Sequence, residues 1–464
     1  MNPLYSIVAF VLAVLLVIWQ IRIWRFRVFL SPGFYFGFIW GIAFLGITIM
    51  HMGGILLEDF PQYIDELNIY AGFSCICFLF WTKIGRNSIN IAQITIKFPE
   101  KAFRILAIVL LIAAIRELLR VNIGLTNMGD ARANVHETME SRSVIIGYAI
   151  SSSMALSILA GYRLVLFLDK KVRISLIKLL FLIMPLFANL LLSIVAGGRV
   201  DFVYSFVYYI IGASLYLPLS YKAKWRVVRI ALLSFIVVFY FISAVQSQRA
   251  ANGSGFRSDL EVYLDSKFPI LGVLYGPIKY MSETYVGYQY RRVDDVDLSN
   301  LGYGQYTFNG FINWTIPFSN QFGMGDFSIA RELNIYYYNQ HTYDYTRDYY
   351  YTTHSGFIPI IKDFGIYGAY VCIFILTLLS HFLFVAIQKK KFIKYCTSLF
   401  FFVIFTDYWI RMNYYGMLSN SILLKLYPFL LIDLLAFVLN DYGGNKHKTS
   451  LSVYKSHSIG AMRK

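Results

Sequence analysis

Apolar residues in this chain gather in long unbroken blocks, not at a helical or strand period. Leu4–Ile23 forms one such block and Phe103–Leu119 another. A block of about 20 apolar residues can cross the hydrocarbon core of a bilayer as a helix. In hydrocarbon a helix satisfies its own backbone hydrogen bonds, so each block is expected to be helical.

The chain divides into eleven candidate spans of this kind. They cover residues 4–23, 33–55, 67–82, 102–119, 143–168, 175–196, 202–219, 227–246, 357–387, 393–411 and 419–438. The span at 357–387 is too long for a bilayer and begins with polar residues, so its first turns are expected outside the membrane. The pattern predicts an all-α, polytopic integral membrane protein with about 11 transmembrane helices (range roughly 10–12) and a large external loop.

Four regions follow from this pattern. Residues 1–246 form an N-terminal bundle of about eight spans, 247–352 the external loop, 353–440 a further three spans, and 441–464 a basic tail. No basic stretch precedes the first apolar block, so we expect no cleavable signal peptide.

Composition agrees with a membrane protein. The 464 residues are 58% hydrophobic and only 15% charged, whereas a soluble domain is about half apolar and about a quarter charged. The four cysteines lie within or beside predicted spans, in neither a disulfide framework nor a zinc pattern, so we predict apolar packing for all of them. They are Cys75, Cys77, Cys372 and Cys396.

Basic residues fall in alternate gaps between the spans. They cluster at 22–27, 83–104, 170–178, 222–229, 389–394 and 446–464. By the positive-inside rule these gaps are cytoplasmic, which puts the N-terminus outside and the C-terminus inside. The formal net charge of +16 is therefore interpreted as a topology signal, and no nucleic-acid partner is expected.

The external segment, roughly 247–351, combines aromatic and basic side chains. It contains Tyr336–Tyr338, Tyr349–Tyr351 and Trp314, together with Arg257, Arg291 and Arg292. Tyr and Trp offer an apolar face that suits a sugar ring, and Arg forms bidentate hydrogen bonds to phosphate. The alternative is an interfacial aromatic belt with ordinary solvated arginines.

Several arginines are expected at one depth, at the outer membrane boundary. Arg199 follows the helix-breaking pair Gly197-Gly198, Arg249 follows the eighth span, and Arg120 and Arg132 flank the first external loop. Together they would neutralise a lipid-linked pyrophosphate without a metal. The alternative for each is an arginine that anchors a helix end.

Two further polar residues are candidates for proton transfer or binding. His354, in Thr353-His354-Ser355-Gly356, is expected at the outer boundary, where a neutral imidazole can accept a proton. Asp363 is a second candidate, or the partner of a nearby arginine. A lone histidine is more often structural.

Charged residues also lie inside predicted spans. Lys425 and Asp433 share one helical face, as do Asp407 and Arg411. They are interpreted either as ion pairs within the bundle or as the lining of a polar path, which would favour a transporter. The chain contains no Walker-type phosphate loop, metal-ligand spacing or Gly-x-Ser-x-Gly turn.

In these motifs the chain resembles the Wzy-type O-antigen and capsule polymerases of bacteria. The resemblance rests on Ile194–Arg199 closing a span, Arg249 opening the large loop, the His354-Ser355-Gly356 turn, and the Asp-Phe-Gly-x-x-Gly stretch Asp363–Gly368. The topology pattern covers nearly the whole chain, and the motifs cover only a small part of it. Such polymerases more often have an even number of spans.

The resemblance implies a glycosyltransferase of the bacterial cytoplasmic (inner) membrane. Such an enzyme transfers a growing glycan from undecaprenyl pyrophosphate to another lipid-linked repeat unit at the outer face, with no nucleotide or metal cofactor. We hypothesise catalytic roles for His354, Arg199 and Arg249. Substrate-binding roles are assigned to Arg132, Arg120, Arg257, Arg291, Arg292 and Asp363. A chain-length regulator is a possible partner.

Three other functions fit the same pattern. An O-antigen ligase shares the topology, the lipid donor and the external loop. A flippase for lipid-linked oligosaccharides would need a charged path through the bundle. A non-catalytic scaffold or receptor is the third. The sequence does not specify the sugars or the linkage formed.

Overall fold

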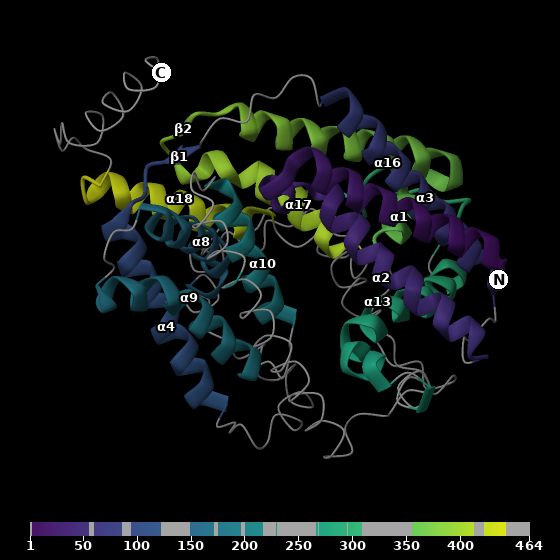
Figure 1. The fold of residues 1–464 in the computed structure, drawn as a ribbon, viewed down its shortest axis with the longest axis horizontal. Helices are drawn as coiled ribbons and strands as arrows, with labels where there is room; N and C mark the ends of the chain where they lie inside the picture. The colour runs from purple at the N-terminus through teal and green to yellow at the C-terminus, as the bar shows by residue number, and fades with distance from the viewer. Residues whose placement is uncertain are drawn as a thin grey trace, which may run out of the picture.

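A computed structural model of the chain describes residues 2–54, 60–85, 94–121, 149–170, 175–195, 200–216, 229, 266–267, 269–294, 296–308, 355–412 and 422–441. The described part is almost entirely helical, as the sequence predicts (Figure 1). It includes two strands of two residues each, β1 (Thr95–Ile96) and β2 (Phe392–Ile393), which pair in parallel.

The helices follow the apolar blocks. In chain order they are α1 (Pro3–Trp24), η1 (Arg25–Leu30), α2 (Pro32–Met52), α3 (Pro61–Gly85), α4 (Glu100–Val121), α8 (Ser153–Lys170), α9 (Leu176–Val195), α10 (Val200–Leu215), α13 (Pro269–Asp294), α16 (Phe357–Lys389), η4 (Cys396–Leu399), α17 (Phe400–Arg411) and α18 (Ile422–Val438).

Six helical segments within the described residues are long and apolar enough to cross a membrane. They are Pro3–Leu30, Pro32–Met52, Pro61–Gly85, Ala149–Asp169, Leu176–Val195 and Phe357–Lys389. Each coincides with a predicted span, which supports a membrane-embedded, all-α protein. The predicted spans at 102–119, 202–219 and 419–438 overlap α4, α10 and α18, which are shorter or more highly charged than these six segments. The span at 227–246 lies almost entirely outside the described residues, and the total of eleven stays a prediction.

The core lies where α17 packs among α2, α3 and α16. The Trp409 ring of α17 meets Phe36 of α2 and Phe78 of α3 edge to face, at centroid distances of 5.2 and 4.9 Å. Its indole N–H donates to the Ser380 hydroxyl of α16 at 2.6 Å. Such ring pairs add specific geometry to the apolar burial. These contacts fix the position of α17 and therefore the positions of Asp407 and Arg411, which lie two residues before and after Trp409.

Helices α8 and α10 approach each other unusually closely. A Cβ at Gly161 of α8 would overlap the backbone of Tyr209, and a Cβ at Gly212 of α10 would overlap the backbone of Ile158. Small residues let membrane helices pack backbone to backbone. These two glycines therefore set the position of α10, which carries Tyr204 and Tyr208.

Helix α13 belongs by sequence to the predicted external loop, yet it packs against α2 and α3. The Tyr285 hydroxyl donates to Asn68 at 2.9 Å. Arg292 Nε and the Tyr288 hydroxyl both donate to Glu66 of α3, at 2.9 and 2.7 Å. At least this part of the predicted loop is thus built onto the helical bundle.

The cysteines are buried and free, as the sequence predicts. Near Cys396 a carboxylate caps the start of η4. Asp433 of α18 accepts from the backbone N–H groups of Cys396 and Thr397, at 2.8 and 2.9 Å. Asp433 therefore holds the start of η4, whereas Lys425, eight positions earlier in the chain, pairs elsewhere.

Candidate functional site

A cluster of charges lies where α10, α17 and α18 meet. Asp407 of α17 is buried, with its side chain only 2% exposed. One of its oxygens accepts from Arg411 Nε at 2.9 Å and from the Tyr208 hydroxyl at 2.6 Å. The other accepts from Lys425 Nζ at 2.8 Å. We refer to Asp407, Arg411, Lys425, Tyr208 and Tyr204 as the cationic cluster.

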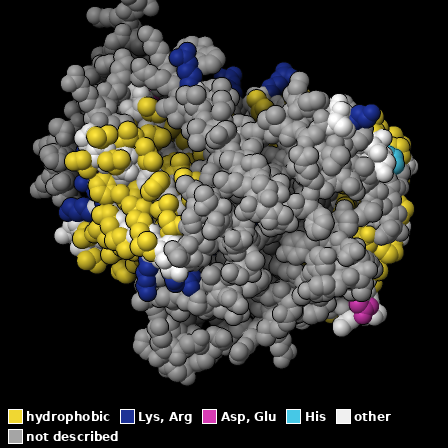
Figure 2. Space-filling view, turned by 90° about the horizontal axis from the view of Figure 1, so that it is seen from below, with side chains coloured by type: hydrophobic (Ala, Val, Ile, Leu, Met, Phe, Trp, Pro, Cys, Tyr) yellow, Lys and Arg dark blue, Asp and Glu magenta, His cyan; other side chains and the backbone are white. Residues whose placement is uncertain are grey.

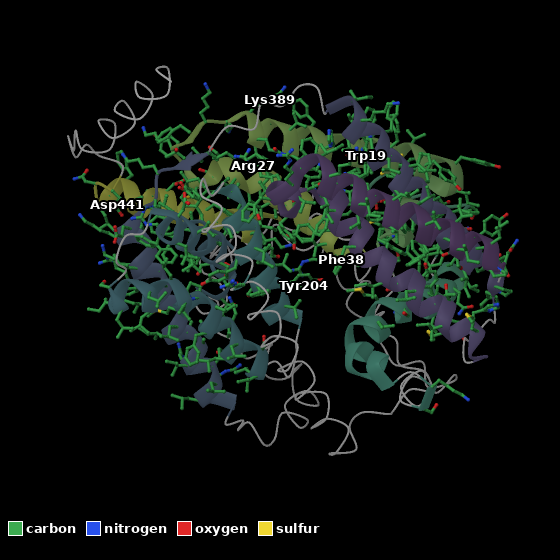
Figure 3. The ribbon with its side chains drawn as sticks, in the orientation of Figure 1. Trp19, Arg27, Phe38, Tyr204, Lys389 and Asp441 are labelled. Carbon is green, nitrogen blue, oxygen red and sulfur yellow. The ribbon has the colours of Figure 1, made fainter. Side chains whose placement is uncertain are left out.

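The cluster carries a net positive charge, because two cations share one carboxylate. The Arg411 guanidinium also donates to the Tyr208 hydroxyl at 3.1 Å and lies over the Tyr204 ring at 3.9 Å. Figure 3 labels Tyr204 near the centre of the molecule, on α10. A charge at membrane depth is energetically costly, so such charges are usually paired or serve a function. One carboxylate can balance only one of these two cations.

Both cations keep a part of their surface accessible. The Arg411 side chain is 25% exposed and that of Lys425 is 24% exposed. The 12 residues of α17 give a length of about 18 Å, short of the about 30 Å of a bilayer's hydrocarbon core. Arg411, the last residue of α17, is held within the bundle by its contacts with Asp407 and Tyr208. The partly exposed cations could therefore contact an anion.

Described residues that adjoin two of the sequence motifs along the chain lie near this cluster. The backbone N–H of Gly356 donates to the carbonyl of Met412, the residue after Arg411, at 2.7 Å. Gly356 belongs to the predicted His354-Ser355-Gly356 turn. Helix α10, which supplies Tyr204 and Tyr208, begins at Val200, directly after the Gly-Gly-Arg motif. Gly356 and the first turns of α10, which are distant in sequence, thus both lie near Arg411.

The other predicted site residues fall in two groups. Arg132, Arg199, Arg249, Arg257 and His354 lie outside the described residues. Of the remainder, Arg120 pairs with Glu117 of its own helix at 2.9 Å, and Arg292 is buried against Glu66 and lies over the Tyr63 ring at 5.1 Å. Arg291 is half-buried on α13. Arg120 and Arg292 therefore already have carboxylate partners.

Asp363 holds the turn at residues 302–307 against α16. Its oxygens accept from the backbone N–H groups of Tyr306 and Thr307, at 3.1 and 2.5 Å. The backbone carbonyls of Lys362 and Asp363 accept from Gly302 and Tyr303, each at 3.1 Å. We call this set of contacts the Asp363 clasp.

Beyond the clasp, α16 is broken. Gly365 has φ 69° and ψ −179°, a conformation that L-residues avoid, so the helix is interrupted there. Residues 357–364 therefore form a half-helix before the break, and the expectation that the first turns of this span lie outside the membrane stays a prediction. The half-helix begins directly after Gly356, which contacts Met412 beside the cationic cluster. It ends at the Asp363 clasp.

Asp363→Asn is expected to loosen the turn. An asparagine keeps one acceptor oxygen but turns an N–H₂ group toward a backbone N–H, and an unmet buried donor costs about 1–3 kcal/mol. Local opening of the turn should therefore become at least about 10-fold more frequent. Limited chymotrypsin digestion of the purified protein should show faster cleavage after Tyr303, whose side chain is 82% exposed.

Asp297→Asn is the matched control for this variant, because Asp297 lies in the same segment but is exposed, and its carboxylate accepts from the nearby Ser299. Its cleavage rate should equal that of the wild type. Equal rates in Asp363→Asn and the wild type, with the cut mapped by N-terminal sequencing, would contradict the clasp.

Sequence reasoning identified the charges of the cluster but not their partners. It placed Lys425 with Asp433 on one helical face, whereas the structure pairs Lys425 with Asp407. It did not single out Tyr204 or Tyr208. The position of Asp407, Arg411 and Lys425 within apolar blocks marks them as candidate site residues. This pattern does not show which helices lie next to each other.

Comparison with known proteins found no matching family model, curated protein or solved structure.

Proposed function

We propose that this protein is a membrane glycosyltransferase that polymerises undecaprenyl-pyrophosphate-linked oligosaccharide repeat units into surface polysaccharide. The observation that carries the proposal is the cationic cluster, in which Arg411 and Lys425 share Asp407 and remain partly accessible. A lipid-linked pyrophosphate is an anion that lies at membrane depth, and its charge would complement the surplus cation.

The proposed reaction is a transfer of the glycan from pyrophosphate to an acceptor hydroxyl. The bond from the glycan C1 to the pyrophosphate oxygen breaks, and a bond from C1 to an acceptor hydroxyl oxygen forms. The hydroxyl proton passes to a base, and undecaprenyl pyrophosphate leaves with the bonding electrons. Cations fixed beside the leaving group stabilise the charge that develops on it. Arg411 and Lys425 have the chemistry for that role.

The hypothesised base is His354, which is two positions before Gly356 in the chain. The contact of Gly356 with Met412 supports a base near the cationic cluster, since the chain between His354 and Gly356 is short. Arg199 and Arg249 are hypothesised to complete the grip on the pyrophosphate. The aromatic external segment would position the two glycans.

The proposed location is the cytoplasmic (inner) membrane of a bacterium, with the N-terminus and the large loop outside and the C-terminus in the cytoplasm. The alternating distribution of Lys and Arg supports this orientation. In this orientation the proposed glycosyl transfer takes place at the outer face of the membrane. The lipid is already activated there, so neither a nucleotide nor a metal is needed.

Incubating the purified protein with synthetic undecaprenyl-pyrophosphate repeat unit is expected to produce a ladder of products, each longer by one unit. Gel electrophoresis of the labelled glycan measures the ladder. Transfer of the unit to an added acceptor with no ladder would indicate a ligase. Movement of labelled lipid across liposomes without elongation would indicate a flippase, which could use the same cationic cluster. Either result would overturn the polymerase proposal.

A further inference from the structure

A second group of cations surrounds Glu100, at the start of α4. Arg104 of α4 forms an ion pair with Glu100. Arg163 Nη2 of α8 and Lys178 Nζ of α9 lie 3.9 and 4.0 Å from the Glu100 oxygens. One carboxylate thus faces three cations from three helices. The side chains of these cations are 24–46% exposed, so the surplus positive charge is open to a ligand.

Aromatic rings hold the two guanidinium groups in place. Arg163 lies over the rings of Phe98 and Phe167, at 5.1 and 4.7 Å, and Arg104 lies over Phe181 of α9 at 5.5 Å. A stacked guanidinium keeps its N–H edge free for an anion and loses little further freedom on binding. The group is therefore preorganised, unlike a run of mobile surface lysines.

The nearby carboxylate of Asp441 does not cancel this charge. Asp441 accepts from the backbone N–H groups of Lys101 and Ala102 at 2.9 and 3.0 Å, and even with its charge counted the named cations outnumber the two carboxylates. Lys101 also adds a cation to the same turn of the helix, and its Nζ donates to the Leu439 carbonyl at 3.3 Å. The net charge around Glu100 remains positive.

An exposed apolar surface adjoins the cations. The side chains of four residues on α4 and four on α9 are 41–72% exposed; they are Ile105, Ile108, Val109, Ile112, Leu176, Ile177, Leu180 and Ile183. Figure 2 shows an apolar patch at the left, on the side where Figure 1 places α4 and α9, with Lys and Arg side chains at its edges. An occupant that matches both features has an anionic head and apolar chains.

We propose that Arg104, Arg163 and Lys178 form a binding site for the phosphate headgroup of an anionic glycerophospholipid, whose acyl chains lie along α4 and α9. Charge-assisted hydrogen bonds from arginine to phosphate supply the affinity. Basic sites between membrane helices are known to hold acidic lipid headgroups. This site is separate from the cationic cluster around Asp407 and does not depend on the proposed transferase activity.

The test measures the dissociation constant of fluorescent phosphatidylglycerol for the purified full-length protein in detergent. The double variant Arg163→Gln, Lys178→Gln is expected to bind about 10-fold more weakly or worse, because each removed cation weakens attraction to an acidic headgroup. Glu100→Gln removes the competing carboxylate and is expected to bind more tightly than the wild type. A folding defect cannot produce both changes, since their signs are opposite.

The matched control is the double variant Lys389→Gln, Lys390→Gln, which removes two exposed cations from the end of α16. It should bind phosphatidylglycerol as the wild type does, and phosphatidylcholine with the same acyl chains should bind weakly to every variant. Equal weakening in both double variants would indicate diffuse attraction and overturn the site. Complete displacement of the lipid by millimolar inorganic phosphate would also overturn it, in favour of a free-phosphate site.

Discussion

Arg411→Gln is expected to reduce chain extension by about 100-fold or more, because removing one fixed donor to a developing anion costs about that much. The variant leaves Asp407 paired with Lys425 at 2.8 Å, so the remaining pair is neutral and neither of its charges is left unpaired. Loss of activity should therefore come without loss of fold. The initial rate of ladder formation from synthetic lipid-linked repeat unit, at saturating substrate, measures the effect.

Two further variants sharpen this expectation. Arg411→Lys keeps the charge but loses the planar group that lies over Tyr204 and donates to Tyr208, so its rate should fall between those of the wild type and Arg411→Gln. Lys389→Gln removes an exposed cation and should leave the rate unchanged. A normal rate in Arg411→Gln would exclude the cationic cluster from the reaction.

Asp407→Ala is expected to destabilise the protein more than any other single change in the cluster. It leaves Arg411 and Lys425 facing each other with no carboxylate between them, and removing one partner from a buried ion pair costs about 3–5 kcal/mol. The Tyr208 hydroxyl also loses its acceptor. Thermal unfolding in detergent, followed by the amount of monodisperse protein that remains, should shift to a markedly lower temperature.

The Asp407 prediction has its own controls. Asp297→Ala removes an exposed carboxylate and should leave the unfolding temperature nearly unchanged, as surface substitutions usually do. Combining Asp407→Ala with Lys425→Met should recover part of the lost stability, because one unpaired cation disappears as well. A wild-type unfolding temperature in Asp407→Ala would show that the carboxylate does not hold α10, α17 and α18 together.

The sequence predicted helical spans well where an apolar block stands alone. Such a block needs no partner to be recognised, because its length and lack of charge already meet the requirement for crossing a bilayer. The block at 393–411 was predicted as one span, but the structure divides it. It contains β2, η4 and the short helix α17, and local hydropathy does not reveal where a strand pair or a capping carboxylate such as Asp433 divides an apolar stretch.

The candidate site shows the same limit. Asp407 and Arg411 are four positions apart on one helix, so their pairing follows from helical periodicity and could be predicted from the sequence. Lys425 and Tyr208 come from other helices, and Tyr208 is 199 positions from Asp407. Asp363 was a candidate for substrate binding, but its oxygens meet backbone N–H groups of residues 56 and 57 positions away.

By itself, then, the sequence determined that this is a membrane-embedded helical protein and that it carries charges within its apolar blocks. Both conclusions rest on interactions with the solvent, which each segment makes independently of the others. Only the tertiary structure decided that two cations share Asp407, that the half-helix 357–364 joins the Asp363 clasp to the neighbourhood of Arg411, and that Glu100 faces three cations. Those arrangements depend on which helices adjoin, which is set by side-chain shape and close glycine contacts, as between α8 and α10, and not by hydropathy.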